Sequence, residues 1–557
     1  MKKLRIVIST LLVLSLALAL FGCAGSGSPT TATSPSTNPQ PSSSNTAAPS
    51  ASTNSSAPPA SADTSTKDWV SYTVGVTGYL GRLVDGVPPL VNFMAADCVY
   101  NVLWYNDPVT GKVVSDVLED ISMEDATTWV LKLKPGVYFS NGDEATADDV
   151  IFSFMQYEMR NSPKLANYGL IDDQCVARDR YTAVFKTKLP FPSFTDNTIS
   201  LYDKAWAESV GFDSQEWEHP VGSGPYYCYE YVMDDHITLR LRDDYWDKAN
   251  SDYHVDEWII KYYPDESTMF MDLELGNIVW CDVGITDYSR YVAQGGNGYE
   301  CLPILNGVPN YFSFGFACTD IWNDIAVRKA VAYGVDWNAL GVAQREDLSM
   351  PLTSTVSSKS KFHIDVGTYE FNPDLAKQTL ADAGYKPGDI NVHLYIMDQP
   401  LYKPLAEGFQ YYCSQIGINV TIDYGDTTSA QQKWTGDDPP DGGFFEFVAG
   451  SLSGDPLWIY GLMVADTGYK WLWVKDPAFK QQLIDAVYCA DPDQQMQRYH
   501  DIQQKIYDEY LVMPINESVS AYGYRTDVFT KDQMQQCTIT NAYLWLSKLS
   551  KSDSGWQ

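Results

Sequence analysis

The sequence has 557 residues and a formal net charge of −33, because 71 acidic residues outnumber 38 basic ones. This acidic excess argues against nucleic-acid binding, since phosphates attract basic surfaces. The length exceeds one ordinary domain and predicts two or three.

The first residues have the pattern of an export signal. Basic residues at positions 2, 3 and 5 precede an apolar run from Ile6 to Phe21, an order typical of a secretory signal peptide. The run is shorter than the ~20 residues of a spanning helix. The sequence LFGC at 20–23 resembles a bacterial lipobox, so we expect a signal peptide at 1–22 and a lipid on Cys23. The alternative is an ordinary signal peptide with an incidental cysteine.

The segment 23–67 is a predicted disordered linker. Between Ser26 and Thr66 it contains mainly Ser, Thr, Pro and Ala, with Asp63 as its only charge and no aromatic residue. Such a composition buries too little apolar surface to offset the entropy of ordering. We interpret it as a tether between the membrane and the folded body, or as a glycosylated stalk with the same mechanical role.

The remaining chain alternates strand-like and helix-like segments. Alternating hydrophobicity predicts strands at 129–134, 237–242 and 418–424. The capping-box pattern at Thr146 predicts the start of a helix whose apolar face extends to Tyr157. Further helices are expected from Pro373, capped by Asn372 and ended by Gly384, and from Lys403 to Ile416. Interleaved strands and helices indicate an α/β fold.

The sequence shows no signature of metal or catalytic chemistry. The nine cysteines after Cys23 are never within four residues of each other, and the six histidines are scattered, which excludes the usual zinc spacings. Residues 450–454 read GSLSG, with Leu452 where a hydrolase elbow needs serine. No nucleotide-binding P-loop occurs. We therefore predict no catalytic residue, no metal and no cofactor. A pair of acidic residues acting as in glycosidases is left open as a distant alternative.

A series of segments resembles the family 5 extracellular solute-binding proteins, the oligopeptide- and dipeptide-binding components of ABC importers. In chain order they read WVLKLKPGVYFSNGDEATADDVIFSF, PVGSGPY, LRLRDDYW, VDEWIIKYYPDESTMFMDLELGNI, IWNDIAVRKAVAYGVDWNAL, FNPDLAKQTLADAGY, GINVTIDY and YDEYLVMPINESVSAYGY. Together they extend from about Tyr72 to Val528. Within the fifth segment, Arg328 matches the arginine of the family pattern, for which we expect a structural role in a helix.

The resemblance implies a bilobed periplasmic-binding-protein fold with an inserted small domain and a ligand-enclosing cleft. Lobe one would combine 68–100, 222–300 and 515–557. The inserted subdomain would be 101–221, and lobe two 301–514. Chain crossings near 300 and 515 would form the hinge.

The resemblance also directs attention to the loop near residue 455. Peptide-binding relatives often carry G-D-x-x-D-P there, with the earlier aspartate accepting the α-ammonium group. Here Asp455-Pro456 matches the end of the pattern, while Leu452 occupies the place of the earlier aspartate. Asp455 is therefore a candidate ligand contact, with a turn or helix cap as the alternative.

Four further candidates complete the predicted ligand site. Trp458 and Trp434 flank the loop, and a ligand cleft favours aromatic walls. Tyr79 follows the predicted first strand, and Asn306 lies near the predicted hinge. The alternative for the tryptophans is core packing, the commonest role of aromatic residues.

We interpret the chain as a lipid-anchored receptor on the extracytoplasmic face of a bacterial membrane, and we expect a monomer. It would capture peptides and deliver them to an ABC permease and its ATPase, without catalysis. Oligosaccharides are the alternative cargo, in line with the tryptophan content and Leu452. A secreted glycoside hydrolase is the alternative from another class.

Overall fold

The computed structural model describes residues 69–551, apart from positions 79, 84–91, 107–111, 160–167, 196–197, 295–297, 317, 400, 427–428, 431, 434–440, 448–455, 457–459, 461–475, 540–542 and 545. The chain divides into two units at Trp69, and the second unit is Val70–Gln557. Every element described below belongs to the second unit.

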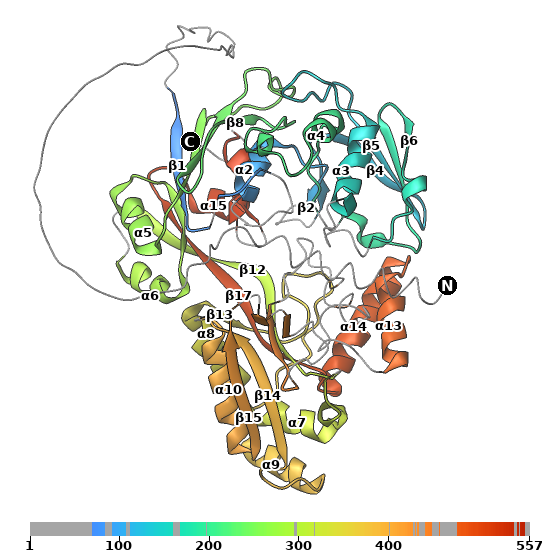
Figure 1. The fold of residues 1–557 in the computed structure, drawn as a ribbon, viewed down its shortest axis with the longest axis vertical. Helices are drawn as coiled ribbons and strands as arrows, with labels where there is room; N and C mark the ends of the chain where they lie inside the picture. The colour runs from blue at the N-terminus through green and yellow to red at the C-terminus, as the bar shows by residue number, and fades with distance from the viewer. Residues whose placement is uncertain are drawn as a thin grey trace, which may run out of the picture. The chain divides into compact units, whose positions relative to one another are not determined.

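A mixed sheet of nine strands forms the largest element of this unit (Figure 1). Its strand order is β16-β12-β17-β11-β1-β10-β9-β8, and β13 also pairs with β17. Strand β1 runs parallel to β10 and β11, and the other pairs are antiparallel. The strands are β1 Ser71–Val76, β8 Tyr226–Val232, β9 His236–Leu241, β10 Glu257–Tyr262, β11 Trp280–Val283, β12 Tyr299–Ser313, β13 Ser349–Pro351, β16 Phe444–Phe447 and β17 Val512–Arg525.

Helices cover both faces of this sheet. One face carries Val74, Trp280 and Tyr522 and packs with α2, α4, α15 and α16. The opposite face carries Cys281 and Ala521 and packs with α5 and α6. The alternation follows from the strand period of two, which sends neighbouring side chains to opposite faces. The helices are α2 Asn92–Val99, α4 Lys204–Val210, α5 Glu266–Leu275, α6 Ile285–Gln294, α15 Lys531–Cys537 and α16 Leu546–Leu549. Two short strands, β18 Thr538–Ile539 and β19 Tyr543–Leu544, pair nearby in sequence.

A separate antiparallel sheet of four strands has the order β4-β5-β7-β6. Helix α3 packs against it, and the Asp149 carboxylate accepts hydrogen bonds from the Thr146 amide and hydroxyl, both at 2.8 Å. The predicted capping box at Thr146 is therefore confirmed, as is the strand predicted at 129–134. The elements are β4 Leu118–Asp125, β5 Thr128–Leu133, α3 Ala147–Met159, β6 Val176–Asp179 and β7 Thr182–Lys186, with the short pair β2 Tyr105–Asn106 and β3 Val113–Val114 before them.

Residues 325–425 build a parallel strand pair with helices around it, which we call the β14–β15 unit. The Asn372 side chain accepts a hydrogen bond from the Leu375 amide at 3.0 Å, confirming the predicted helix cap. The predicted helix from Lys403 and the strand at 418–424 are also confirmed. The elements are α7 Ile325–Gly334, α8 Trp337–Arg345, α9 Pro373–Asp382, β14 Ile390–Met397, α10 Lys403–Gln415 and β15 Ile418–Gly425.

Arg328 in α7 has the structural role predicted for it. Its Nη1 donates to the Trp322 carbonyl oxygen at 2.7 Å, and Nε and Nη2 donate to the Glu509 carbonyl oxygen at 3.0 and 2.9 Å. The guanidinium thus satisfies backbone acceptors at two loops, one of them after α14 (Pro492–Asp508). Helix α14 packs with α13 (Pro477–Val487) and shares an apolar core with the four-stranded sheet. The Phe191 and Tyr488 rings lie 6.5 Å apart where these parts meet.

Two long strands, β12 and β17, connect the apolar cores. They pair antiparallel over nearly their whole length and lie side by side in Figure 1. Met513 and Ile515 belong to the core of the β14–β15 unit, whereas Val519 and Tyr522 belong to cores of the nine-stranded sheet. Strand β17 therefore leaves one core and enters another within a few residues. None of the helices in the described ranges is both long and apolar enough to span a bilayer.

Candidate functional site

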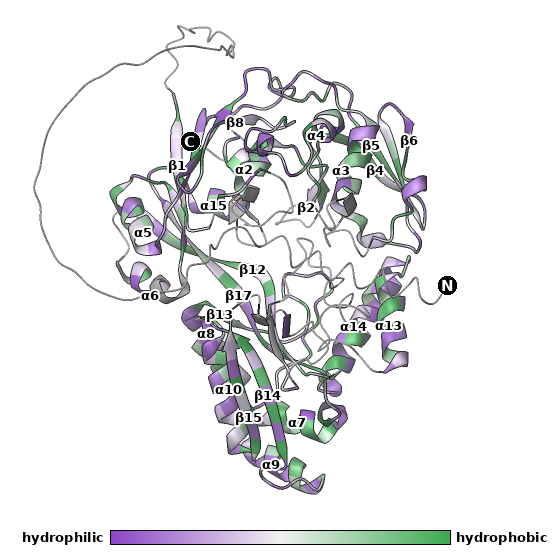
Figure 2. Ribbon diagram, viewed as in Figure 1, coloured by the Kyte–Doolittle hydropathy of each residue, from purple (hydrophilic) through white to green (hydrophobic). Residues whose placement is uncertain are grey.

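One face of β17 is polar although the strand is buried. Its alternate residues are Asn516, Ser518, Ser520, Tyr522 and Tyr524, and all but Ser520 are at most 2 % exposed. Figure 2 shows hydrophilic and hydrophobic residues mixed along this strand. Buried polar groups are costly unless they find partners, so a polar face in the middle of a sheet indicates a specific role.

The first half of this face forms a hydrogen-bonded network with its neighbours, in which only Asn310 Oδ1 and Gln344 Nε2 lack a partner among the described residues. The Asn310 amide donates to Asn516 Oδ1 at 2.5 Å and to Ser518 Oγ at 2.9 Å. The Asn516 amide in turn donates to Gln344 Oε1 at 3.1 Å and to Ser349 Oγ at 3.3 Å. The network joins β12, β17, α8 and β13 at the place where β17 passes between cores. The network therefore fixes the geometry of β12 and β17 at the place where β17 passes from one apolar core to the next.

Glu517 lies on the opposite face of the same part of β17 and is hydrogen-bonded to a neighbouring loop. Its side chain is 1 % exposed and accepts hydrogen bonds from the Ser358 amide at 3.1 Å and the Ser358 hydroxyl at 2.6 Å, and also from the Ser357 hydroxyl. A buried carboxylate is stable only when such donors surround it. This arrangement binds the loop at 357–358 to β17.

The second half of the polar face is different, because its groups lack partners. Asp282 in β11 lies opposite Tyr522 in β17, and Trp280 lies two positions before Asp282 on the same face. The Trp280 and Tyr522 rings are stacked, with centroids 5.3 Å apart and planes 21° apart. The Trp280 indole nitrogen and the Tyr522 hydroxyl are buried and make no hydrogen bond of normal geometry with any described residue, although the Ser520 side chain is close enough to act on the pKa of Tyr522.

The Asp282 carboxylate also forms no ion pair or hydrogen bond with the residues that the structure describes, although it is only partly exposed. Burial raises the pKa of Asp282 to about 7, and the negative charge of Glu266 contributes to this rise. The carboxyl group is consequently close to half-protonated at neutral pH. Burial first, and then the charge of Asp282, raises the pKa of Tyr522. A positive charge placed here would restore the ionised form of Asp282.

The ligand-binding residues predicted from the sequence fall outside what the structure describes. This holds for Asp455, Trp458, Trp434 and Tyr79, and for the lipidation candidate Cys23. The backbone of Asn306 lies in β12 between Leu305 and Val308, where the pairing with β17 shifts register, and its side chain is among those not described. All six assignments remain predictions.

Asp282, Trp280 and Tyr522 were missed by the sequence interpretation. Two signals could have identified them. Asp282 is an isolated acidic residue in the apolar run IVWCDVG. In NESVSAYGY, every second residue is polar or tyrosine, and the residues between them are apolar or glycine except Glu517. Read with the strand period of two, this pattern predicts a polar face on one side of a strand.

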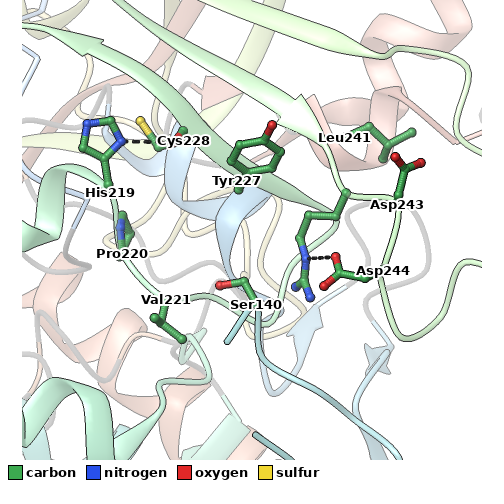
Figure 3. Close-up of a pocket in the computed structure, with 10 residues that line it drawn as sticks. Ser140, His219, Pro220, Val221, Tyr227, Cys228, Leu241, Asp243 and Asp244 are labelled. Atoms are coloured by element: carbon green, nitrogen blue, oxygen red, sulfur yellow. Dashed lines mark hydrogen bonds and ion pairs between the residues drawn. The ribbon is translucent and has the colours of Figure 1, made fainter. Parts of the chain in front are cut away.

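A second group of residues lines a surface cavity of about 420 Å³ (Figure 3). It lies between the β8–β9 hairpin, residues 219–221 and Ser140. The buried Arg242 side chain holds this region together: Nε donates to Asp244 Oδ1 at 3.0 Å, and Nη1 donates to the carbonyl oxygens of Gly222 and Gly224 at 3.2 and 3.1 Å. These contacts fix the turn at 220–226. We therefore assign the cavity a structural role.

No group of three or more His, Cys, Asp and Glu side chains is arranged to hold a metal ion within the described ranges. Burial raises the pKa of the Cys98, Cys281 and Cys413 thiols, so these thiols stay protonated and behave as small apolar residues. Within the described residues, the polar face of β17 therefore has neither a metal-ligand cluster nor a reactive thiol.

Comparisons with known proteins identify the family of this chain and the structures that share its fold. The model of the "Bacterial extracellular solute-binding proteins, family 5 Middle" matches residues 112–469. The oligopeptide-binding protein AppA of Bacillus subtilis is 26 % identical over 444 residues, covering 72 % of this chain and 79 % of AppA. The crystal structure of the ABC transporter substrate-binding protein CtaP from Listeria monocytogenes has a TM-score of 0.76 at 20 % identity, covering 86 % of this chain and 99 % of CtaP.

A second similar structure is the DppA binding protein of Helicobacter pylori in complex with the peptide STSA, with a TM-score of 0.69 at 18 % identity, covering 86 % of this chain and 97 % of that one. The fold is therefore the mixed α/β fold of periplasmic binding proteins with an additional small antiparallel sheet, as predicted. The family match and this fold define a solute-binding protein of an ABC importer. The chain belongs to the family 5 extracellular solute-binding proteins, which bind rather than catalyse.

Proposed function

We propose that this protein captures peptides outside the cytoplasm and delivers them to an ABC permease, whose ATPase supplies the energy. The observation that carries the proposal is the polar face of β17, which presents unpaired buried groups in a chain of the peptide-binding family. Peptides expose a backbone donor and acceptor at every residue, so such groups can bind them with little dependence on side chains.

Binding would act through a change between open and closed forms. Strands β12 and β17 are the hinge in this proposal, with 68–100, 222–300 and 515–557 as lobe one, 101–221 as the inserted subdomain and 301–514 as lobe two. The network at Asn310 and Asn516 lies within the paired strands. A ligand that contacts both lobes favours the closed form only by its difference in affinity for the two forms. The closed form would then dock on the permease.

The proposal includes a lipid anchor on Cys23. A signal peptide at 1–22 would be removed, and 23–67 would tether the folded body to the extracytoplasmic face of the membrane. Expression of the full chain in a bacterial host should yield a detergent-soluble membrane protein whose N-terminal mass includes the lipid. Cys23→Ala should release the protein from the membrane. Membrane association that survives this substitution would contradict the anchor.

Peptide cargo can be separated from oligosaccharide cargo by thermal unfolding. The protein is first unfolded and refolded to remove any carried ligand, and is then titrated with a mixed-length peptide pool or with an oligosaccharide pool. Ligand at 100 times its Kd adds about 2.7 kcal/mol to the free energy of unfolding. We expect the peptide pool alone to raise the midpoint. A rise with oligosaccharides alone would overturn the peptide assignment and support the sugar alternative.

A further inference from the structure

Asp282 is a carboxylate without a counter-ion in a mostly enclosed position. Among the titratable groups around it, Tyr522 lies opposite it in β17, Cys281 precedes it in β11, and the negative charge of Glu266 at the start of α5 acts on it. None of these groups supplies a positive charge. A buried carboxylate is ordinarily paired or surrounded by donors, as Glu517 is in this same protein.

The surroundings of Asp282 favour a cation. The stacked rings of Trp280 and Tyr522 lie on the same sheet face and are only 1 and 2 % exposed, so the partly exposed Asp282 is the member of this group that a ligand can reach directly. The indole nitrogen of Trp280 is in addition an unused donor, and the Tyr522 hydroxyl can donate or accept. A partly exposed carboxylate without a counter-ion, with unused hydrogen-bonding groups buried beside it, is complementary to a positively charged group that has an acceptor oxygen next to it.

We propose that Asp282, with Trp280 and Tyr522 beside it, forms the subsite that binds a positively charged group of the cargo. The inference rests on the proposed function and specifies the chemistry of its ligand. The charge can come from the α-ammonium group of a peptide, which has a carbonyl oxygen next to it, or from a lysine or arginine side chain. Both would form a charge-assisted hydrogen bond with the Asp282 carboxylate.

Three peptide pools of random tri- to nonapeptides distinguish the sources of charge. The first lacks Lys, Arg and His but has free amino termini, the second is the same pool N-acetylated, and the third is N-acetylated but contains Lys and Arg. Each pool is titrated by calorimetry against the refolded full chain, the Asp282→Asn variant and the Glu266→Gln variant. Glu266→Gln is the matched control, because it removes a nearby negative charge on an exposed side chain.

If the α-ammonium is bound, the first pool should bind the unmodified protein roughly ten- to a hundredfold more tightly than the second. If a side chain is bound, the third pool should show that advantage. In either case Asp282→Asn should abolish the advantage, whereas Glu266→Gln should keep it. Binding of the preferred pool should also weaken about 30-fold between about pH 8 and about pH 5.5 as the Asp282 carboxyl takes up its proton, and Asp282→Asn should lose this dependence.

Two results overturn the inference while leaving peptide binding intact. One is an equal affinity for all three pools, and the other is an advantage of a charged pool that persists in Asp282→Asn. If no peptide pool binds the unmodified protein, the proposed peptide cargo fails instead. The subsite is then tested with arginine and with agmatine as non-peptide cations. Binding that depends on Asp282 would support the subsite, and absence of binding would overturn it.

Discussion

The two halves of the polar face of β17 use similar residues for different purposes. From Asn516 to Ser518 the polar side chains bind one another and the neighbouring elements. At Tyr522 the polar groups of β17 and β11 have no such partners. Both halves are buried, so burial alone does not distinguish a structural polar residue from a ligand-binding one. The distinction lies in how far the fold itself satisfies the polar groups. In the first half Asn310 Oδ1 and Gln344 Nε2 lack a partner among the described residues but their side chains are otherwise hydrogen-bonded, whereas the Trp280 nitrogen and the Tyr522 hydroxyl have no such bond to those residues.

The energetic consequence is also different. A satisfied network stabilises the native arrangement, and removing one member leaves the others unpaired. An unsatisfied group costs stability in the free protein, and a ligand recovers that cost when it binds. Substitutions in the first half should therefore change stability, and substitutions in the second half should change affinity.

The largest expected effect comes from Asn516→Ala. The substitution removes the donor to Gln344 and Ser349 and one of the two side-chain acceptors of the Asn310 amide, which keeps its bond to Ser518. We expect a loss of about 2–4 kcal/mol in the free energy of unfolding, measured by urea denaturation of the refolded protein. The affinity of the folded variant for peptides should change little. A loss below about 0.5 kcal/mol would show that the network contributes little to the stability of the paired strands β12 and β17.

An intermediate effect is expected from pH at Asp282. Its carboxyl group holds a proton more tightly in the folded protein, with a pKa of about 7, than in the unfolded chain, where the value is near 3.9. This contribution to stability is fully present below about pH 4 and is lost as the pH rises through about 7.

Without ligand, Asp282→Asn should therefore be more stable than the unmodified protein at about pH 8, by about 2 kcal/mol because the side chain is partly exposed. The difference should disappear at about pH 4. Urea denaturation at both pH values measures it. A variant that is less stable than the unmodified protein at about pH 8 would mean that Asp282 has a stabilising partner in the folded state.

The fold could be predicted from the sequence to a considerable extent, because its signals are local. The capping residues Thr146 and Asn372 and the alternation at 129–134 are determined by neighbours in the chain, and the structure has these elements as expected. The order of the quoted segments then indicated the family. Local signals of this kind depend on backbone geometry that is the same in every protein.

The candidate site could not be predicted in the same way. Asp282 and Tyr522 are 240 positions apart in the sequence and meet only because β11 and β17 pair in the sheet. Sequence reasoning instead followed the resemblance to the loop at Asp455, which lies outside the described residues. The polar alternation of β17 was visible in the sequence, but it does not reveal which of its polar groups the fold leaves without partners.

The smallest effects provide the sharpest comparison, through two conservative substitutions on the same strand face. Ser518→Ala removes the oxygen that accepts from the Asn310 amide at 2.9 Å, and we expect a loss of about 1 kcal/mol in the free energy of unfolding. Tyr522→Phe removes a hydroxyl that has no partner of normal geometry and keeps the ring stacked on Trp280. We expect its stability to stay within about 0.5 kcal/mol of the unmodified protein, or to increase slightly.

Peptide affinity should respond in the opposite order. Tyr522→Phe should weaken binding of the preferred pool several-fold, because the hydroxyl lies beside the proposed cation subsite, and Ser518→Ala should leave it unchanged. Urea denaturation and calorimetry on both variants give the four values required. If the two substitutions affect stability and affinity alike, the division of β17 into a structural half and a binding half is wrong. If Ser518→Ala lowers only stability and Tyr522→Phe lowers only affinity, then the presence or absence of hydrogen-bond partners distinguishes structural from ligand-binding residues on one continuous buried strand.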